Sequence, residues 1–127
     1  MVTAYDSTFA RLVSDAGAEC ILVGDSLGMV LQGHDTTVPV SLEAMVYHTE
    51  CVARARPKSM IVADLPFMTY SSPDVALTAS MELMQQGAQM VKLEGGVWLS
   101  ETIHQLVQRG IPAVSYTHLR AHETVDY

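Results

Sequence analysis

The sequence predicts an α/β fold built on a parallel sheet. Short apolar runs rich in β-branched residues alternate with helix-like stretches over residues 1–114, and this alternation is typical of βαβ units. Three of the apolar runs end at an acidic residue, namely Asp25, Asp64 and Glu94. Parallel α/β folds bind ligands beyond the carboxyl ends of their strands, so these acids also point to a functional site.

The first elements follow from short-range patterns. We predict a strand over residues 2–4 and a helix over residues 7–16, where apolar side chains recur at helical spacing and Gly17 ends the helix. A second apolar run predicts a strand over residues 20–23. A long glycine-containing loop then covers residues 26–39.

Two serines mark the helices in the middle of the chain. Ser41 caps a helix that extends to about residue 55, and a strand is predicted over residues 60–63. Ser72-Pro73-Asp74 begins the next helix, since serine caps it, proline fits its first turn and the acid faces the positive end of its dipole. This helix is expected to extend through residue 86.

The same alternation continues to residue 114. A strand is predicted over residues 90–93, followed by a helix over residues 99–109 that Gly110 ends. A fifth strand is predicted over residues 111–114.

Two architectures fit this alternation: an open doubly wound sheet and a (β/α)8 TIM barrel. An open sheet is usually complete in about 120–150 residues, whereas a barrel needs about 250. As a barrel, the 127 residues would form only the first four to five βα units. The long loop after the second strand and the acidic strand ends favour the barrel, although periodicity alone leaves both open.

The composition is that of one modest globular domain, with 49% hydrophobic and 17% charged residues. The net charge of −7 argues against a nucleic-acid partner bound through its phosphates. No apolar run reaches membrane-spanning length, and no signal-peptide pattern opens the chain. Cys20 and Cys51 lack metal-ligand spacing, so we expect reduced thiols and a cytoplasmic location.

The three strand-end acids are candidate metal ligands. Each alone could be a turn residue or a solvated strand end, but their recurrence at equivalent positions favours a shared site. Carboxylates that converge without partners repel one another, and a hard divalent cation such as Mg²⁺ relieves this repulsion because it takes oxygen ligands. We therefore predict that Asp25, Asp64 and Glu94 bind a metal ion.

Ser26 and Lys92 are candidates for contact with an anionic substrate. The Ser26 hydroxyl could donate a hydrogen bond to a carboxylate, although a plain turn serine fits its position equally well. Lys92 precedes Glu94 by two residues and so shares its face of the strand. In a barrel interior this lysine needs a carboxylate or an anionic substrate as its partner, whereas on an exposed edge it would extend into solvent.

Several runs of the sequence together resemble the ketopantoate hydroxymethyltransferase family, in the family's order and with similar spacing over residues 1–114. These runs are Thr3-Ala4-Tyr5-Asp6, Val23-Gly-Asp-Ser-Leu-Gly-Met29, Gln32-Gly-His-Asp35, Tyr47-His48-Thr49, Ala63-Asp-Leu-Pro-Phe-Met68, Met90-Val-Lys-Leu-Glu-Gly-Gly96 and Trp98-Leu99.

The resemblance implies a (β/α)8 barrel of the phosphoenolpyruvate/pyruvate type and transfer of a hydroxymethyl group from 5,10-methylenetetrahydrofolate to 3-methyl-2-oxobutanoate, in pantothenate biosynthesis. It implies Mg²⁺ at Asp25, Asp64 and Glu94. It also implies that Asp25, Ser26, Asp64 and Lys92 bind the keto acid. A homo-oligomer is implied for the full-length protein.

The resemblance further implies that the general base, a glutamate, lies in the second half of the barrel, beyond the sequence given. We assign no catalytic residue within residues 1–127 and expect this chain alone to be inactive and poorly soluble. Two alternatives remain open: another Mg²⁺-dependent lyase or mutase of the same barrel superfamily acting on an α-keto acid, and a non-catalytic segment that binds a keto acid or an oligomeric partner.

The character of the sequence changes at Ser115. Residues 115–127 show neither strand nor clean helical periodicity, and they resemble the translation of a sequencing-adapter read-through. His118 and His122 are four residues apart, but no further ligand completes a metal site beside them. We expect residues 1–114 to be the barrel segment and residues 115–127 to be a non-native tail.

Overall fold

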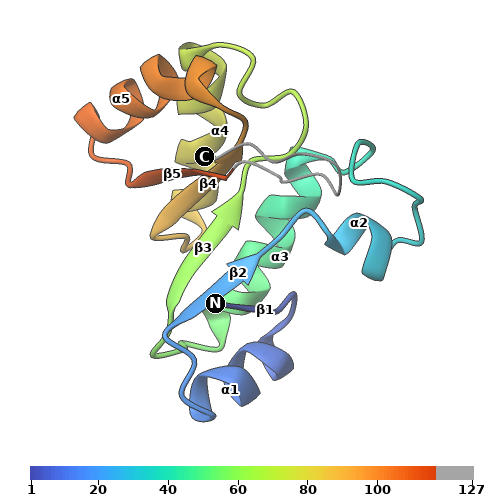
Figure 1. Cartoon of the computed structure of the whole chain (residues 1–127). Coiled ribbons are helices and arrows are strands. Elements are labelled where there is room, and N and C mark those ends of the chain that lie inside the picture. The colour runs from blue at the N-terminus through green and yellow to red at the C-terminus, as the bar shows by residue number, and fades with distance from the viewer. Residues whose placement is uncertain (117–127) are drawn as a thin grey trace, which may run out of the picture.

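The computed structural model describes residues 1–116 (Figure 1). Its strands are β1 (Val2–Thr3), β2 (Cys20–Val23), β3 (Met60–Asp64), β4 (Met90–Glu94) and β5 (Ala113–Tyr116). Its helices are α1 (Ser7–Asp15), α2 (Leu27–Val30), α3 (Leu42–Arg54), α4 (Pro73–Gln85) and α5 (Ser100–Gln108), with a 3₁₀ turn, η1 (Val97–Leu99), before α5.

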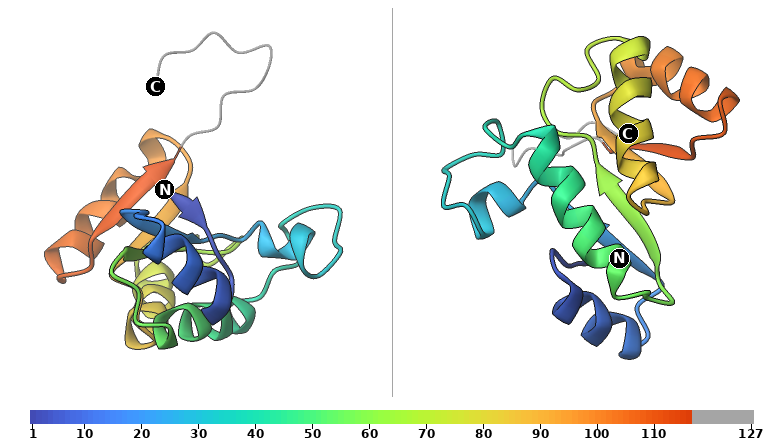
Figure 2. Two further views of the ribbon diagram at one scale, coloured as in Figure 1. Left: turned by 90° about the horizontal axis from the view of Figure 1, so that it is seen from below. Right: turned by 180° about the vertical axis from the view of Figure 1, so that it is seen from behind.

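The strands form one parallel sheet in the order β1-β2-β3-β4-β5. Helices α3 and α4 lie on one face of this sheet, as the view from behind in Figure 2 shows. A doubly wound sheet reverses its strand order and carries helices on both faces, whereas sequential order with helices outside is the winding of a (β/α)8 barrel. The described strands are therefore the first five of a barrel, as predicted.

Side-chain caps begin helices α1, α3 and α4. Asp6 accepts a hydrogen bond from the Phe9 N–H at 2.8 Å, and Ser41 accepts one from the Ala44 N–H at 3.0 Å. Ser72 caps α4 in the same way, with proline at the first turn. Each cap satisfies an N–H that has no partner within its helix, so the sequence fixes where each helix begins.

The core lies between the sheet and the helices. Ile21 and Val23 on β2, and Val91 and Leu93 on β4, are fully buried there. Large side chains that meet them from the helices include Met45, Val52, Leu83 and Leu106, also fully buried. Alternate residues of each strand face the helices, so the intervening residues, including Asp64 and Lys92, face the barrel interior.

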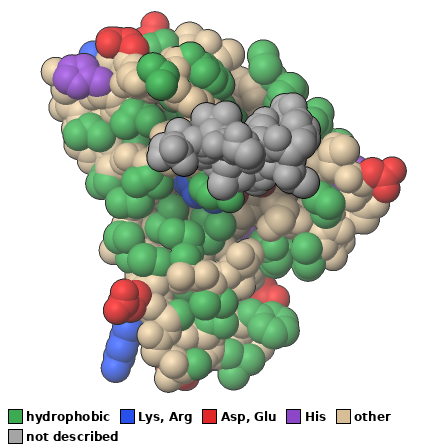
Figure 3. Space-filling view, in the orientation of Figure 1, with side chains coloured by type: hydrophobic (Ala, Val, Ile, Leu, Met, Phe, Trp, Pro, Cys, Tyr) green, Lys and Arg blue, Asp and Glu red, His purple; other side chains and the backbone are tan. Residues whose placement is uncertain are grey.

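The two outer strands leave the sheet open in the described range. Val2 on β1 and Val114 and Tyr116 on β5 are 40–44% exposed. In Figure 3, which shows the sheet face turned away from α3 and α4, hydrophobic side chains are spread over much of the visible surface. Edges and apolar faces of this kind promote association, and the expected poor solubility stays a prediction.

Most elements end within about one residue of the predicted positions, and two parts of the chain differ more. Helix α2 interrupts the predicted loop because Leu27 is buried in the core and Gly28 packs closely against Val40. Strand β5 begins later than predicted and continues through Ser115 and Tyr116, which pair with Leu93 and Glu94 of β4. Pairing to a neighbouring strand thus extends a strand whose own sequence has no β pattern.

Residues 117–127, which hold most of the predicted non-native tail and the His118 and His122 pair, lie outside the described residues. The predicted boundary at residue 114 stays a prediction. Among residues 1–116, no helix has the length and apolar character needed to cross a membrane. Cys20 and Cys51 are both free thiols.

Gly87 offers a test of the packing between α3 and the turn before β4. Its φ is +120°, and a Cβ there would lie 2.4 Å from the Ala53 Cβ. Gly87→Ala should lower the free energy of unfolding by about 2–4 kcal/mol, since overpacking adds to backbone strain. Gly17 has a φ of +98° with open space around it, so Gly17→Ala should cost only about 1 kcal/mol. Urea unfolding followed by circular dichroism measures both, and equal losses would contradict this packing.

Candidate active site

The site is built where β2, β3 and β4 end. Asp64 and Glu94 are the last residues of β3 and β4, and Asp25 follows β2 after Gly24. Parallel pairing sets Val23 beside Ala63 and Asp64 beside Lys92. The register therefore brings the acidic ends of three strands to the same edge of the sheet, as the sequence predicted.

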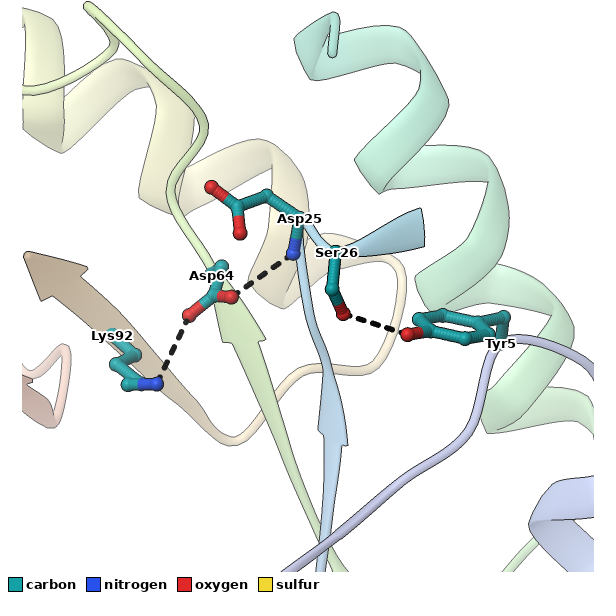
Figure 4. Close-up of polar contacts among 5 residues, drawn as sticks. All are labelled: Tyr5, Asp25, Ser26, Asp64 and Lys92. Atoms are coloured by element: carbon teal, nitrogen blue, oxygen red, sulfur yellow. Dashed lines mark hydrogen bonds and ion pairs between the residues drawn. The ribbon is translucent and has the colours of Figure 1, made fainter. Parts of the chain in front are cut away.

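Asp64 connects the three strands (Figure 4). One of its carboxylate oxygens accepts a hydrogen bond from the Asp25 N–H at 3.0 Å, and the other lies 3.8 Å from the Lys92 Nζ. Gly24 makes room for this contact, because a Cβ at Gly24 would lie 3.3 Å from the same Asp64 oxygen. The glycine thus lets a side chain approach the backbone closely.

The charge of Asp64 is poorly compensated. Burial raises the pKa of the Asp64 carboxyl, and the nearby charge of Glu94 raises it further. The Asp25 N–H and the Lys92 ammonium lower this pKa, but they do not offset the burial. The folded chain therefore disfavours the ionised form of Asp64 unless more positive charge is brought to the site.

A cavity of about 230 Å³ lies beside these groups, lined by Asp25, Thr37, Phe67, Tyr70 and Glu94. The charges of all three acids affect the pKa of Tyr70. Burial is the main cause of the raised pKa of its hydroxyl, and the negative charge of Glu94, then of Asp25 and Asp64, raises it further. Asp25, Asp64 and Glu94 thus act on one small region, although Asp64 does not itself line the cavity.

Ser26 belongs to a second set of contacts at the same edge. Its Oγ lies 2.6 Å from the hydroxyl of Tyr5, and the Tyr5 carbonyl oxygen lies 2.7 Å from Nδ1 of His48 (Figure 4 shows Tyr5 and Ser26). A carbonyl only accepts hydrogen bonds, so Nδ1 of His48 carries the proton. His48 on α3 thereby fixes the loop after β1, and Tyr5 in that loop positions Ser26.

The donor chemistry of the site fits a hard divalent cation. The ends of these strands carry three carboxylates and one lysine, which leaves an excess of negative charge, and carboxylate oxygens are the ligands that Mg²⁺ takes. Within residues 1–116, however, no three His, Cys, Asp or Glu side chains are close enough to hold a metal ion as they stand. The three carboxylates would have to draw closer together for all of them to bind one ion.

The structure thus brings together Asp25, Ser26, Asp64, Lys92 and Glu94, the residues that the sequence singled out. It adds Thr37, Phe67 and Tyr70 as lining residues, and Tyr5 and His48 as supports. Tyr70 lies in a turn without periodicity, so no local pattern marked it, and Phe67 lies in a family-like run but was given no role. By contrast, His34 and Asp35 are exposed loop residues outside this lining.

Comparison with known sequences identifies relatives of this chain. The family model described as ketopantoate hydroxymethyltransferase matches residues 1–125. A 3-methyl-2-oxobutanoate hydroxymethyltransferase from Burkholderia multivorans is 57% identical over 119 residues, which cover 94% of this chain and 44% of the relative. The enzyme of the same name from Paraburkholderia phytofirmans shows the same identity and coverage. The chain therefore spans less than half the length of these curated relatives.

Solved structures share the fold at low sequence identity. A 2,3-dimethylmalate lyase, a member of the PEP mutase/isocitrate lyase superfamily, matches with a TM-score of 0.70 and 17% identity over 98% of this chain and 49% of the lyase. A putative lyase/mutase from Burkholderia cenocepacia matches with a TM-score of 0.74 and 15% identity over 93% of this chain and 48% of that protein. At these identities the likeness shows the fold alone, with this chain matching about half of each protein.

The raised pKa of Asp64 predicts a pH dependence of stability. A carboxyl whose pKa is higher in the folded chain than in the unfolded chain stabilises the fold at low pH and loses that contribution as pH rises through the folded value. Asp64→Asn removes this titration but keeps an oxygen that can accept from the Asp25 N–H. The free energy of unfolding of Asp64→Asn, relative to that of the unchanged protein, should therefore increase as the pH is raised from about 4 to about 7.

Urea unfolding at both pH values tests this expectation, with Asp35→Asn on the exposed loop as the matched control. A difference in stability that stays constant with pH for Asp64→Asn would show that Asp64 carries its charge without cost in the folded chain.

Proposed function

This chain belongs to the ketopantoate hydroxymethyltransferase family, and we propose that it forms the metal- and keto-acid-binding part of an enzyme that transfers a hydroxymethyl group from 5,10-methylenetetrahydrofolate to 3-methyl-2-oxobutanoate, giving 2-dehydropantoate. The observation that carries the proposal is the meeting of three strand-end acids and one lysine beside a cavity of about 230 Å³. The family match favours this reaction over a lyase or mutase reaction, because the lyase and mutase structures resemble the chain in fold alone.

The keto acid carries a carboxylate, and two of the candidate residues suit its negative charge. Lys92 is partly exposed, with 22% of its side-chain surface accessible, and its ammonium is 3.8 Å from Asp64. It can therefore face a bound anion without leaving its strand. The Ser26 hydroxyl can donate a hydrogen bond to the substrate while it accepts one from Tyr5. Asp25 and Asp64 complete the proposed set for the keto acid.

Asp25, Asp64 and Glu94 are the residues that would hold Mg²⁺. When bound, a hard divalent cation supplies Lewis-acid stabilisation of negative charge on a substrate oxygen. The ammonium of Lys92 adds a second positive charge at the same edge. Because the surroundings of Asp64 are largely buried, the local dielectric is low and both electrostatic interactions are stronger. These residues thus prepare the keto acid to lose a proton from C3.

The proposed acceptor of this proton is a group outside the described residues. The family resemblance supports a general base in the part of the relatives that this chain does not span, and loss of a general base typically costs about 10²–10⁴-fold in rate. We therefore propose binding without family-like turnover for the 127-residue chain. From the same resemblance we propose homo-oligomeric assembly for the full-length protein, and from its cysteines a cytoplasmic location.

Isothermal calorimetry tests the proposed site. The chain should bind 3-methyl-2-oxobutanoate when Mg²⁺ is present and much more weakly when it is chelated. Glu94→Gln should weaken Mg²⁺ binding by at least about tenfold, because it replaces an ionised oxygen ligand with a neutral amide.

Glu19→Gln is the matched control, since Glu19 is exposed at the amino end of β2, away from the site. Equal binding by Glu94→Gln and Glu19→Gln would contradict the metal assignment. Catalytic turnover by the chain alone would contradict the proposal that the general base lies in the part of the relatives that this chain does not span.

A further inference from the structure

A second cavity, of about 200 Å³, adjoins the carboxylate cavity and differs from it in character. It is lined by Phe67, Met68, Tyr70, Ser71 and Trp98. Phe67 and Tyr70 line both cavities, so the two spaces share one aromatic wall. A ligand in the second cavity would therefore lie directly beside a ligand held by the acids.

The side chains of this second cavity are unusually exposed for their size. Phe67 is 53%, Met68 60% and Trp98 66% exposed, and all three gather around one hollow. Large apolar groups clustered at the surface mark binding sites, because exposing them to water is unfavourable. The rings of Tyr70 and Trp98 are nearly parallel, with 22° between their planes and 6.3 Å between their centroids. They present flat faces suited to a planar ring.

The backbone fixes these rings next to the acids. A Cβ at Gly95 would lie 2.6 Å from the Trp98 ring, so the indole packs directly on the residue that follows Glu94. On the other side, the N–H of Thr69 donates to the carbonyl oxygen of Pro66 at 3.0 Å, and Met68 adopts a φ of 68°. This tight turn holds Phe67 at its tip. The aromatic wall is thus part of the same strand-end framework as Asp64 and Glu94.

We propose that this aromatic cavity binds the reduced pterin ring of the folate that donates the one-carbon unit. The inference rests on the proposed function and adds the place of its second substrate. Ligand cavities for drug-sized molecules measure about 300–1,000 Å³, so 200 Å³ accepts one ring system and leaves the rest of the folate outside. Stacking on aromatic side chains is the usual mode of binding for planar heterocycles.

The charges of the site favour one orientation of the folate. Its pterin end is uncharged, whereas its glutamate tail carries carboxylates that Asp25, Asp64 and Glu94 repel. The pterin therefore enters the aromatic cavity and the tail points to solvent. The one-carbon unit, attached between the pterin and the benzoyl ring, then lies at the wall formed by Phe67 and Tyr70, next to the keto acid.

The sequence contains a single tryptophan, Trp98, so its fluorescence reports on this cavity alone. Titration with 5-formyltetrahydrofolate, a stable reduced folate, should quench Trp98 to saturation. p-Aminobenzoylglutamate lacks the pterin, so it should not produce saturable quenching. The sequence also contains only two phenylalanines, and both are exposed: Phe67 in the cavity and Phe9 on α1, 58% exposed. They provide a matched pair of variants.

Phe67→Ala should weaken folate binding about tenfold, through loss of one stacking wall, whereas Phe67→Tyr and Phe9→Ala should leave it within about twofold. Circular dichroism verifies that each variant is folded. Equal affinity for Phe67→Ala and Phe9→Ala would overturn the assignment of the cavity. Absence of quenching while calorimetry still detects the keto acid with Mg²⁺ would also overturn it, and would leave the proposed function standing. Absence of both binding events would reject the two proposals together.

Discussion

The parallel register of β2, β3 and β4 is the constraint on which the candidate site depends. It sets Asp64 beside Lys92 and places the turn after β2 against the same edge. The Asp64 carboxylate therefore accepts a hydrogen bond from the Asp25 N–H and lies close to the Lys92 ammonium. A shift of one strand by a single residue would send these side chains to the opposite face of the sheet. The buried core of Ile21, Val23, Val91 and Leu93, which packs against the helices, is what holds the register and therefore the site.

The same geometry creates a charge problem that explains why a cation is expected. Asp64 is largely buried, and burial outweighs the help of Lys92 and the Asp25 N–H in setting its pKa. Glu94 and Asp25 add further negative charge around Tyr70. Three acidic side chains at one edge of the sheet repel one another. Three acids at one edge are consistent with a ligand that brings positive charge. The aromatic wall of Phe67 and Tyr70 bounds the space in which the keto acid and the folate would meet.

Much of this arrangement could be predicted from the sequence, because it follows from local rules. Ser41 and Ser72 fixed the starts of α3 and α4, the apolar runs located β2 to β4, and the position of the acids at the strand ends identified the candidate site. What could not be predicted depends on contacts between distant segments. Helix α2 forms because Leu27 reaches the core, β5 extends to Tyr116 because β4 provides backbone partners, and Tyr70 and Trp98 meet only once the ends of β3 and β4 are adjacent. The incomplete convergence of the three carboxylates also depends on side-chain directions that residue spacing does not specify.

The central claim is that the ends of β2, β3 and β4 form one divalent-cation site, and paramagnetic broadening by Mn²⁺ tests it most directly. Nuclear magnetic resonance spectra of the chain should lose the amide signals of Asp25, Asp64 and Gly95 at low Mn²⁺ concentration, and excess Mg²⁺ should restore them. The amide signals of Glu19, Ser59 and Gln89, at the opposite ends of the same strands, should stay sharp. Broadening centred on other acidic residues, or spread evenly over both ends of the sheet, would contradict the account.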